Sequence, residues 1–189
     1  GLSGLHAGAV HGGVHMRVLL LAAVAALAAA VPPKTVERMD LAKYMGTWYE
    51  VAVLPNAPQD GCVDTVVHYR PRAEGGFDLL NTCYKKSKFK PYHGTAKPSE
   101  PGSTTKFYAR FFLFFGSDYW VLDLDPEYRW AVVGNAGRDR LWVISRTPAL
   151  EPAVYDAAVA RAKAQGYPVE KLARTVHTGR ALPADPWAD

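Results

Sequence analysis

The chain has 189 residues, of which 49% are hydrophobic, and a formal net charge of +4 at pH 7. This charge is mild for the length, and no stripe of Lys and Arg with interleaved aromatic residues occurs, so we expect no nucleic-acid partner. The length suits one domain with a sizeable core, and the content of Cys is low, with two residues.

The first predicted element is an export signal. Arg17 precedes an apolar run over residues 18–27, which ends on three alanines. A positive start, a short apolar run and small residues at its end are typical of a secretory signal peptide, and an uncleaved membrane anchor is the alternative. The run is too short to span a bilayer. We therefore divide the chain into a leader at 1–30, a domain at 31–180 and a flexible tail at 181–189.

The next elements are short runs rich in Val, Tyr, Phe, Trp and Leu, bounded by Pro, Gly, Asn or Asp. This pattern predicts strands separated by turns. The predicted strands are residues 47–54, 63–70, 77–84, 94–97, 105–112, 119–124, 130–133 and 141–145. Eight consecutive strands without intervening helices predict an all-β fold, an up-and-down antiparallel barrel whose closure removes the sheet edges.

The pattern changes after Arg146. Pro152 and Gly166 mark the start and the end of a predicted α-helix. Its apolar stripe must be buried, and the outside of the barrel is the available surface. The residues of that stripe are Leu150, Ala153, Val154, Ala157, Ala158 and Ala162.

Three sequence blocks point to a family. Residues 46–50 (Gly-Thr-Trp-Tyr-Glu), 121–125 (Val-Leu-Asp-Leu-Asp) and 141–148 resemble, in order and spacing, the conserved blocks of lipocalins. The second block departs from the usual Thr-Asp-Tyr of the family. The chain is similar to bacterial outer-membrane lipocalins, relatives of apolipoprotein D, and the resemblance covers most of residues 39–176. It implies a barrel that carries a small hydrophobic ligand and is not an enzyme.

Members of that bacterial group are often lipoproteins, with a lipid-bearing cysteine directly after the signal peptide. This sequence has no cysteine before Cys62. We therefore expect a protein that is free in the periplasm or secreted. In such a compartment Cys62 and Cys83, which open and close neighbouring predicted strands, are expected to form a disulfide, with two separately buried thiols as the alternative.

The base of the predicted barrel needs a plug, because an eight-stranded barrel open at both ends would leave its ligand in water. Trp48 is bulky enough to cover this end, and the guanidinium of Arg146 could stack on its ring. Gly46 lets the chain approach closely. We predict a structural role for these three residues, as barrel closure.

Inward-facing positions follow from the two-residue period of a strand, counted from Trp48. A slip of one residue would reverse the choice on any strand. A buried carboxylate at Glu50 needs a partner, for which Arg146 or a tyrosine hydroxyl could serve. The predicted ligand-binding residues are Glu50, Ala52, Val67, Tyr69, Phe107, Ala109, Tyr119, Val121, Trp142 and Ile144.

The loops opposite Trp48 carry a net positive charge, and the turns at the base a net negative one. A basic rim over an apolar cavity suits an anionic amphiphile such as a fatty acid or lysophospholipid, and solvated loop lysines are the alternative. The predicted mouth charges are Lys85, Lys86, Lys88, Lys90, Arg138 and Arg140 against Asp60, Asp118 and Asp139.

Two other functions remain open. The same fold supports capture of haem or an anionic siderophore, and a few lipocalin relatives are isomerases or de-epoxidases. Against an enzyme, the sequence lacks a Gly-x-Ser-x-Gly elbow and a Gly-rich phosphate loop, and the histidines after the leader show no metal-ligand spacing. We expect no cofactor and no metal site. We also expect a monomer or weak homodimer, with at most peripheral contact with membrane lipids.

Overall fold

The computed structural model describes residues 31–112, 115–183 and 185–188. The chain divides into two compact units, residues 1–32 and 33–189, and all that follows concerns the second unit. The predicted leader at 1–30 lies outside the described residues.

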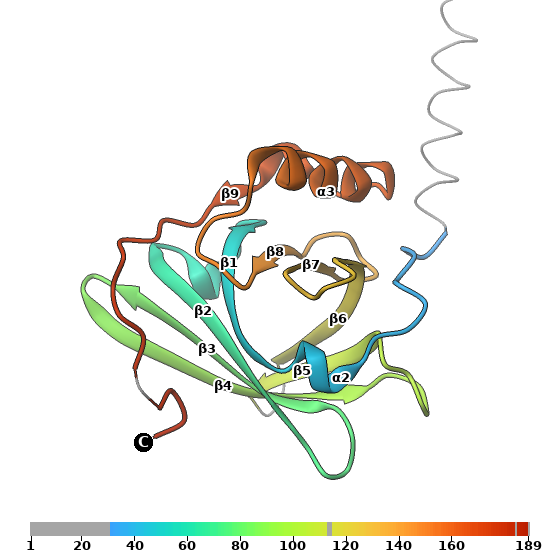
Figure 1. Cartoon of the computed structure of the whole chain (residues 1–189), viewed down its shortest axis with the longest axis horizontal. Helices are drawn as coiled ribbons and strands as arrows, with labels where there is room; N and C mark the ends of the chain where they lie inside the picture. The colour runs from blue at the N-terminus through green and yellow to red at the C-terminus, as the bar shows by residue number, and fades with distance from the viewer. Residues whose placement is uncertain (1–30, 113–114, 184, 189) are drawn as a thin grey trace, which may run out of the picture. The chain divides into compact units, whose positions relative to one another are not determined.

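The second unit is built around a closed antiparallel barrel, as the sequence predicts (Figure 1). Each strand pairs with the next along the chain, and β1 pairs with both β8 and β2, so the sheet closes on itself. The strands are β1 Gly46–Val53, β2 Cys62–Pro71, β3 Phe77–Lys85, β4 Lys88–Pro98, β5 Lys106–Phe112, β6 Phe115–Leu124, β7 Trp130–Gly134 and β8 Leu141–Ser145.

The hairpin of β3 and β4 is longer than predicted. The predicted strands 77–84 and 94–97 leave a loop between them, but β4 already begins at Lys88 and pairs with β3 along its length. Lys86 and Ser87 form the two-residue turn, with φ of 49° and 62°. Positive φ at both turn residues matches the twist of paired strands. The lysines conceal the alternation of apolar and polar residues along this segment, which is why the sequence predicts a loop here.

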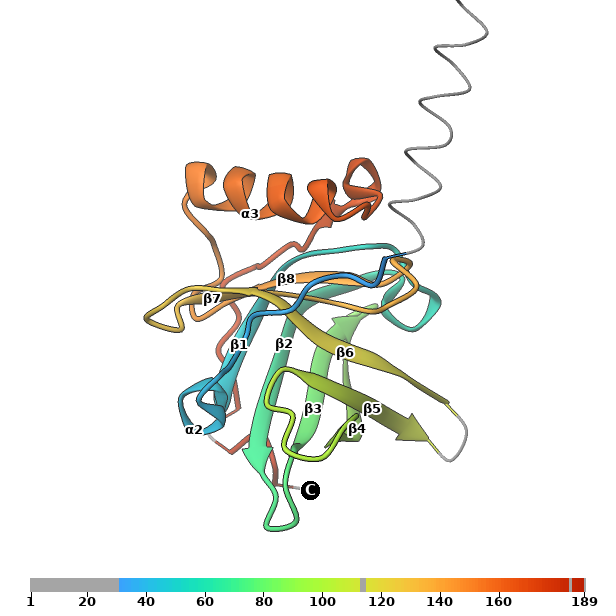
Figure 2. The same ribbon diagram turned by 90° about the vertical axis from the view of Figure 1, so that its right-hand side faces the viewer.

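The long helix α3, Pro152–Ala164, packs outside the barrel, over β7 and β8 in both views (Figures 1 and 2). Its buried residues are Tyr155, Ala158 and Ala162, at the i, i+3, i+7 spacing of one helix face. The predicted stripe was therefore partly wrong, because Ala153 and Ala157 are exposed. Tyr155, which the stripe omitted, supplies the large side chain of this contact.

Three short helices lie between the longer elements. Helix α2, Leu41–Tyr44, precedes β1; the 3-10 helix η1, Ala57–Gln59, lies between β1 and β2; and the 3-10 helix η2, Val169–Lys171, follows α3. The side chain of Asp40 caps α2 by accepting from the backbone N–H groups of Ala42 and Lys43.

A ninth strand, β9 Ala173–Arg174, follows η2 and pairs with the mouth end of β1. This pairing is possible because β1 and β2 are hydrogen-bonded only near the base, from Gly46 to Tyr49. Beyond that point the C-terminal segment lies between them: Thr175 N donates to Val51 O at 3.0 Å, and Asp64 N donates to Val176 O at 2.8 Å. The C-terminal segment thus closes the mouth half of the barrel.

Candidate ligand-binding cavity

The base of the barrel is plugged by Trp48, whose side chain is fully buried. The guanidinium carbon of Arg146 lies 3.7 Å from the centre of the Trp48 ring, which is the predicted cation–π pair. The indole Nε1 donates to the backbone oxygen of Tyr44 at 2.8 Å. Trp48 is therefore held on its ring face and on its polar edge.

Arg146 also binds the chain entering the barrel. It donates to the carbonyl oxygens of Lys43 at 2.7 Å, Thr47 at 2.8 Å and Met45 at 2.9 Å. Gly46 has a φ of +91°, a backbone conformation that favours glycine, while a Cβ there would make only an ordinary contact with this guanidinium, at 3.5 Å. Burial lowers the pKa of Arg146, and the carbonyl dipoles around it stabilise the cation.

Above the plug, aromatic rings form a floor across the interior. Phe77 packs edge-on against Tyr69 at 5.0 Å and against Phe107 at 4.9 Å between ring centroids. Hydrogen bonds join the hydroxyl of Tyr119 to those of Tyr44 at 2.6 Å and Tyr69 at 2.7 Å. Burial raises the pKa of all three tyrosines, so their hydroxyls stay protonated.

Two adjacent chambers lie above the floor. The inner chamber, about 70 Å³, includes Glu50, Val67, Tyr69, Ala109 and Tyr119 in its lining. The outer chamber, about 450 Å³, opens toward the mouth and includes Pro58, Cys83, Tyr92 and Arg140. The chambers are neighbours, because six residues line both of them: Gln59, Thr65, Asn81, Phe111, Ser117 and Trp142.

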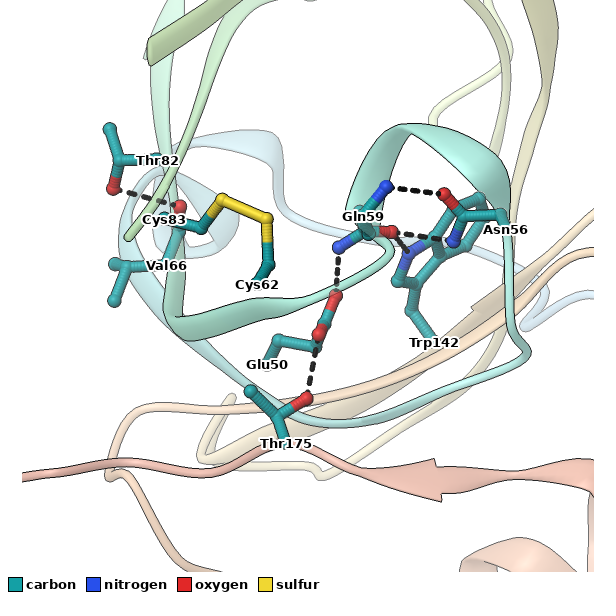
Figure 3. The surroundings of a disulfide bond; sticks show 9 residues. All are labelled: Glu50, Asn56, Gln59, Cys62, Val66, Thr82, Cys83, Trp142 and Thr175. Carbon is teal, nitrogen blue, oxygen red and sulfur yellow. Dashed lines mark hydrogen bonds between the residues drawn. A yellow bond between two sulfur atoms is a disulfide. The ribbon is translucent and has the colours of Figure 1, made fainter. Parts of the chain in front are cut away.

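Gln59 of η1 connects the loop between β1 and β2 to the interior (Figure 3). Its Nε2 donates to Glu50 Oε2 at 2.5 Å, while its Oε1 accepts from Trp142 Nε1 at 3.0 Å and Asn56 Nδ2 at 2.8 Å. On its other oxygen, Glu50 accepts from the hydroxyl of Thr175 at 2.6 Å. The prediction that Arg146 or a tyrosine would pair with Glu50 is therefore wrong.

Burial raises the pKa of the Glu50 carboxyl, while the hydrogen bonds from Thr175 and Gln59 act in the opposite direction. Only 5% of the residue is exposed. Both bonds donate to the carboxyl group, an arrangement that favours its ionised form. The inner chamber thus has an acidic group on its wall.

The structure brings most of the predicted ligand-binding residues together. Seven of them line the inner chamber: Glu50, Val67, Tyr69, Ala109, Tyr119, Trp142 and Ile144. Phe107 and Val121 lie in the interior aromatic and aliphatic cluster without lining the chamber. For all nine, a part in ligand binding stays a prediction.

Ala52 is different, and its predicted inward position is wrong. The strand register shifts between Glu50 and Ala52, so that Val51 is an extra residue in β1. Ala52 consequently packs with Val51, Val143 and Tyr155 of α3, in the cluster outside the barrel. Sequence periodicity gives no signal for such a bulge.

Cys62 and Cys83 form the predicted disulfide, with their Cα atoms 5.6 Å apart (Figure 3). Cys83 lines the outer chamber, so the bridge lies at the mouth. It ties the start of β2 to the end of β3 beside the loop that carries Gln59.

The basic rim also has a structural basis. Arg140 lines the outer chamber. In the β3–β4 hairpin, Asn81 pairs with Tyr92, Cys83 with Lys90, and Lys85 with Lys88. Directly paired residues share one face of a sheet, and alternate residues along a strand do too. Lys85, Lys88 and Lys90 therefore extend the face that lines the outer chamber.

A closed antiparallel barrel with a plugged base and one chambered interior defines a class of single-ligand binding proteins. The chain belongs to the lipocalin family, whose lipocalin-like domain matches residues 39–177. This family binds small hydrophobic ligands. The resemblance seen in the sequence is thereby confirmed.

Relatives and solved structures agree with this assignment. The chain is 35% identical over 152 residues to temperature-induced lipocalin-1 of Arabidopsis thaliana, covering 75% of this chain and 81% of the relative. It is 32% identical over 174 residues to the outer membrane lipoprotein Blc of Escherichia coli K12, covering 83% and 96%. Insecticyanin of Manduca sexta has the same fold, with a TM-score of 0.64 at 16% identity over 79% and 86% of the chains.

Within residues 31–112, 115–183 and 185–188, no helix is long and apolar enough to cross a membrane.

Proposed function

We propose that this lipocalin binds and carries an anionic amphiphile of the fatty acid or lysophospholipid class. Its chain occupies the outer chamber and its head group lies at the rim. The observation that carries the proposal is a chamber of about 450 Å³ with Arg140 in its lining and Lys85, Lys88 and Lys90 on the same face above it.

The chamber has the size and chemistry that such a ligand needs. Pockets for small molecules measure about 300–1,000 Å³ and are mostly apolar with a few placed polar groups. Phe111, Trp142, Pro58 and Tyr92 supply apolar surface here. The cations at the mouth attract an anionic head group and leave it in contact with water, where its charge is solvated.

We also propose that the protein is not an enzyme and acts in the periplasm or outside the cell. The disulfide between Cys62 and Cys83 supports this compartment, because such bonds persist in oxidising environments. The E. coli relative is named an outer membrane lipoprotein. We expect the protein to act as a monomer or weak homodimer, with peripheral membrane contact only.

The test replaces Lys85, Lys86, Lys88 and Lys90 together with Gln. Quenching of tryptophan fluorescence is titrated with hexadecanoate and with the neutral probe N-phenyl-1-naphthylamine, at low and high salt. Hexadecanoate should bind the variant more weakly at low salt, and the difference should shrink as salt is added, because exposed charges are screened within about 8–10 Å. The neutral probe should bind both proteins equally.

A matched control replaces four exposed lysines elsewhere, Lys34, Lys97, Lys163 and Lys171, which changes the net charge by the same amount. This control should bind hexadecanoate like the unmodified protein. Equal binding of hexadecanoate to all three proteins at low salt would refute the basic rim. Organic extraction and an absorbance spectrum of the purified protein test the other ligands, since bound haem is coloured and a fatty acid is not.

A further inference from the structure

The inner chamber contains more hydrogen-bonding groups than an alkyl chain can use. We propose that it is a polar subsite, which binds a hydroxyl group at the end of the ligand opposite its head group. This inference rests on the proposed function, because it assigns the far end of the same amphiphile.

The first observation is Thr65, on the inward face of β2. Only 4% of this residue is exposed, and its hydroxyl oxygen has no hydrogen-bond partner within the described residues. The residue lines both chambers, at their junction. A buried hydroxyl without a partner is destabilising, and buried polar groups in proteins are seldom left unpaired. A polar atom on the ligand would supply the missing partner.

The second observation comes from counting hydrogen atoms on the tyrosine cluster. Tyr44, Tyr69 and Tyr119 carry three hydroxyl hydrogens, but two hydrogen bonds join them. Because all three stay protonated, one hydrogen remains for another acceptor. Rotation of the hydroxyls can present this hydrogen from Tyr69 or Tyr119, both of which line the inner chamber.

The chamber wall also holds an acceptor. Each carboxylate oxygen of Glu50 receives one hydrogen bond, from Gln59 or from Thr175. A carboxylate has about four lone-pair sites, so two remain. A hydroxyl group, unlike a methyl group or a carbonyl, can accept from a tyrosine and donate to Glu50 at the same time. The paired donor and acceptor therefore favour a hydroxyl.

The size of the chamber limits what enters it. Its volume is about 70 Å³, and the aromatic floor of Tyr69, Phe77 and Tyr119 closes it below. It is much smaller than the outer chamber, at about 450 Å³, so it has room for the end of a ligand and not for its whole chain. The chemical class indicated is a hydroxylated amphiphile, such as an ω-hydroxy fatty acid.

The experiment compares ω-hydroxy fatty acids with unsubstituted acids of equal length, over a range of chain lengths, by calorimetry. At the length that spans both chambers, the unmodified protein should bind the hydroxy acid about three- to tenfold more tightly, the gain from one or two well-placed hydrogen bonds. Thr65→Val and Tyr119→Phe keep the side-chain shapes and remove the hydroxyls. Each should reduce this preference, measured within one variant as the ratio of its affinities for the hydroxy acid and the unsubstituted acid of equal length.

Thr105→Val is the matched control, because Thr105 is also buried, with 6% exposed, but bonds to Thr35 and lines neither chamber. This variant should keep the preference. If no acid of either series binds, the fatty acid part of the proposed function fails, and the subsite, which rests on it, fails with it. If unsubstituted acids bind and the hydroxy acids gain nothing at any length, or Thr65→Val and Tyr119→Phe keep the full preference, the subsite is refuted while the proposed function stands.

Discussion

Replacing Trp48 with Ala should lower the free energy of unfolding by about 3–5 kcal/mol, the usual range for truncating a buried large aromatic side chain. The structure supports the whole of this range, because Trp48 is fully buried, donates to Tyr44 O at 2.8 Å and lies under Arg146. The barrel base cannot easily collapse into the space left, since the strands around it are fixed by hydrogen bonds. A resulting cavity adds to the lost burial.

The part due to Arg146 can be separated with a double-mutant cycle that combines Trp48→Ala with Arg146→Met. The guanidinium carbon lies 3.7 Å from the ring centre and is half-buried, so we expect a coupling of about 1–2 kcal/mol. Arg146→Met alone should lower the free energy of unfolding by more than this coupling energy, because the carbonyl oxygens of Lys43, Thr47 and Met45 also lose their donor.

Urea unfolding followed by circular dichroism, with the disulfide oxidised, measures each variant. Trp187→Ala is the matched control, because Trp187 also lies under an arginine, Arg70, at 4.3 Å but is not fully buried. Trp187→Ala should lower the free energy of unfolding by less than about 1 kcal/mol, as for exposed cation–π pairs. If Trp48→Ala lowered the free energy of unfolding no more than Trp187→Ala does, the role of Trp48 as a plug at the barrel base would be refuted.

Three further predictions follow from single contacts. Thiol titration of the denatured, unreduced protein should find no free thiol from Cys62 or Cys83, and two thiols would disprove the bridge. Asp64→Asn should lower the free energy of urea unfolding by about 1–2 kcal/mol, because the bonds from Thr178 N and Oγ1 lose their charged acceptor; an unchanged midpoint would contradict this. Burial lowers the pKa of His68 from 6.5, so the unfolded chain binds more protons below that pH. Stability should therefore fall as the pH drops from 6.5 toward the folded pKa, and His68→Gln should lose this part of the pH dependence.

The parts of the molecule that the sequence predicted correctly are those set by short-range pattern. Alternation and turn residues gave the eight barrel strands, and the order of the three sequence blocks gave the contact of Trp48 with Arg146. The disulfide followed from two cysteines at the ends of strands that a short turn connects. In each case the residues concerned lie on strands whose period fixes their direction.

The errors arise where that period is interrupted or concealed. The bulge at Val51 turned Ala52 outward, and lysines concealed the alternation of β4. Thr65 could have been found by extending the inward series from Val67 by one step. Gln59 and Thr175 could not, because one lies in a loop and the other meets Glu50 across 125 residues of sequence.

The position of Thr175 gives the C-terminal segment a second role beyond closing the barrel. Thr175 donates to one oxygen of Glu50, and Gln59 donates to the other. The Glu50 carboxylate therefore links three parts of the molecule: the C-terminal segment, through Thr175; the loop at the mouth, through Gln59; and the wall of the inner chamber. A ligand hydroxyl that donates to Glu50 would join this network. A substitution at Glu50 should therefore change both the affinity for the ligand and the packing of the C-terminal segment. The aromatic floor limits how deep a ligand reaches, and this network selects the polar group at its end.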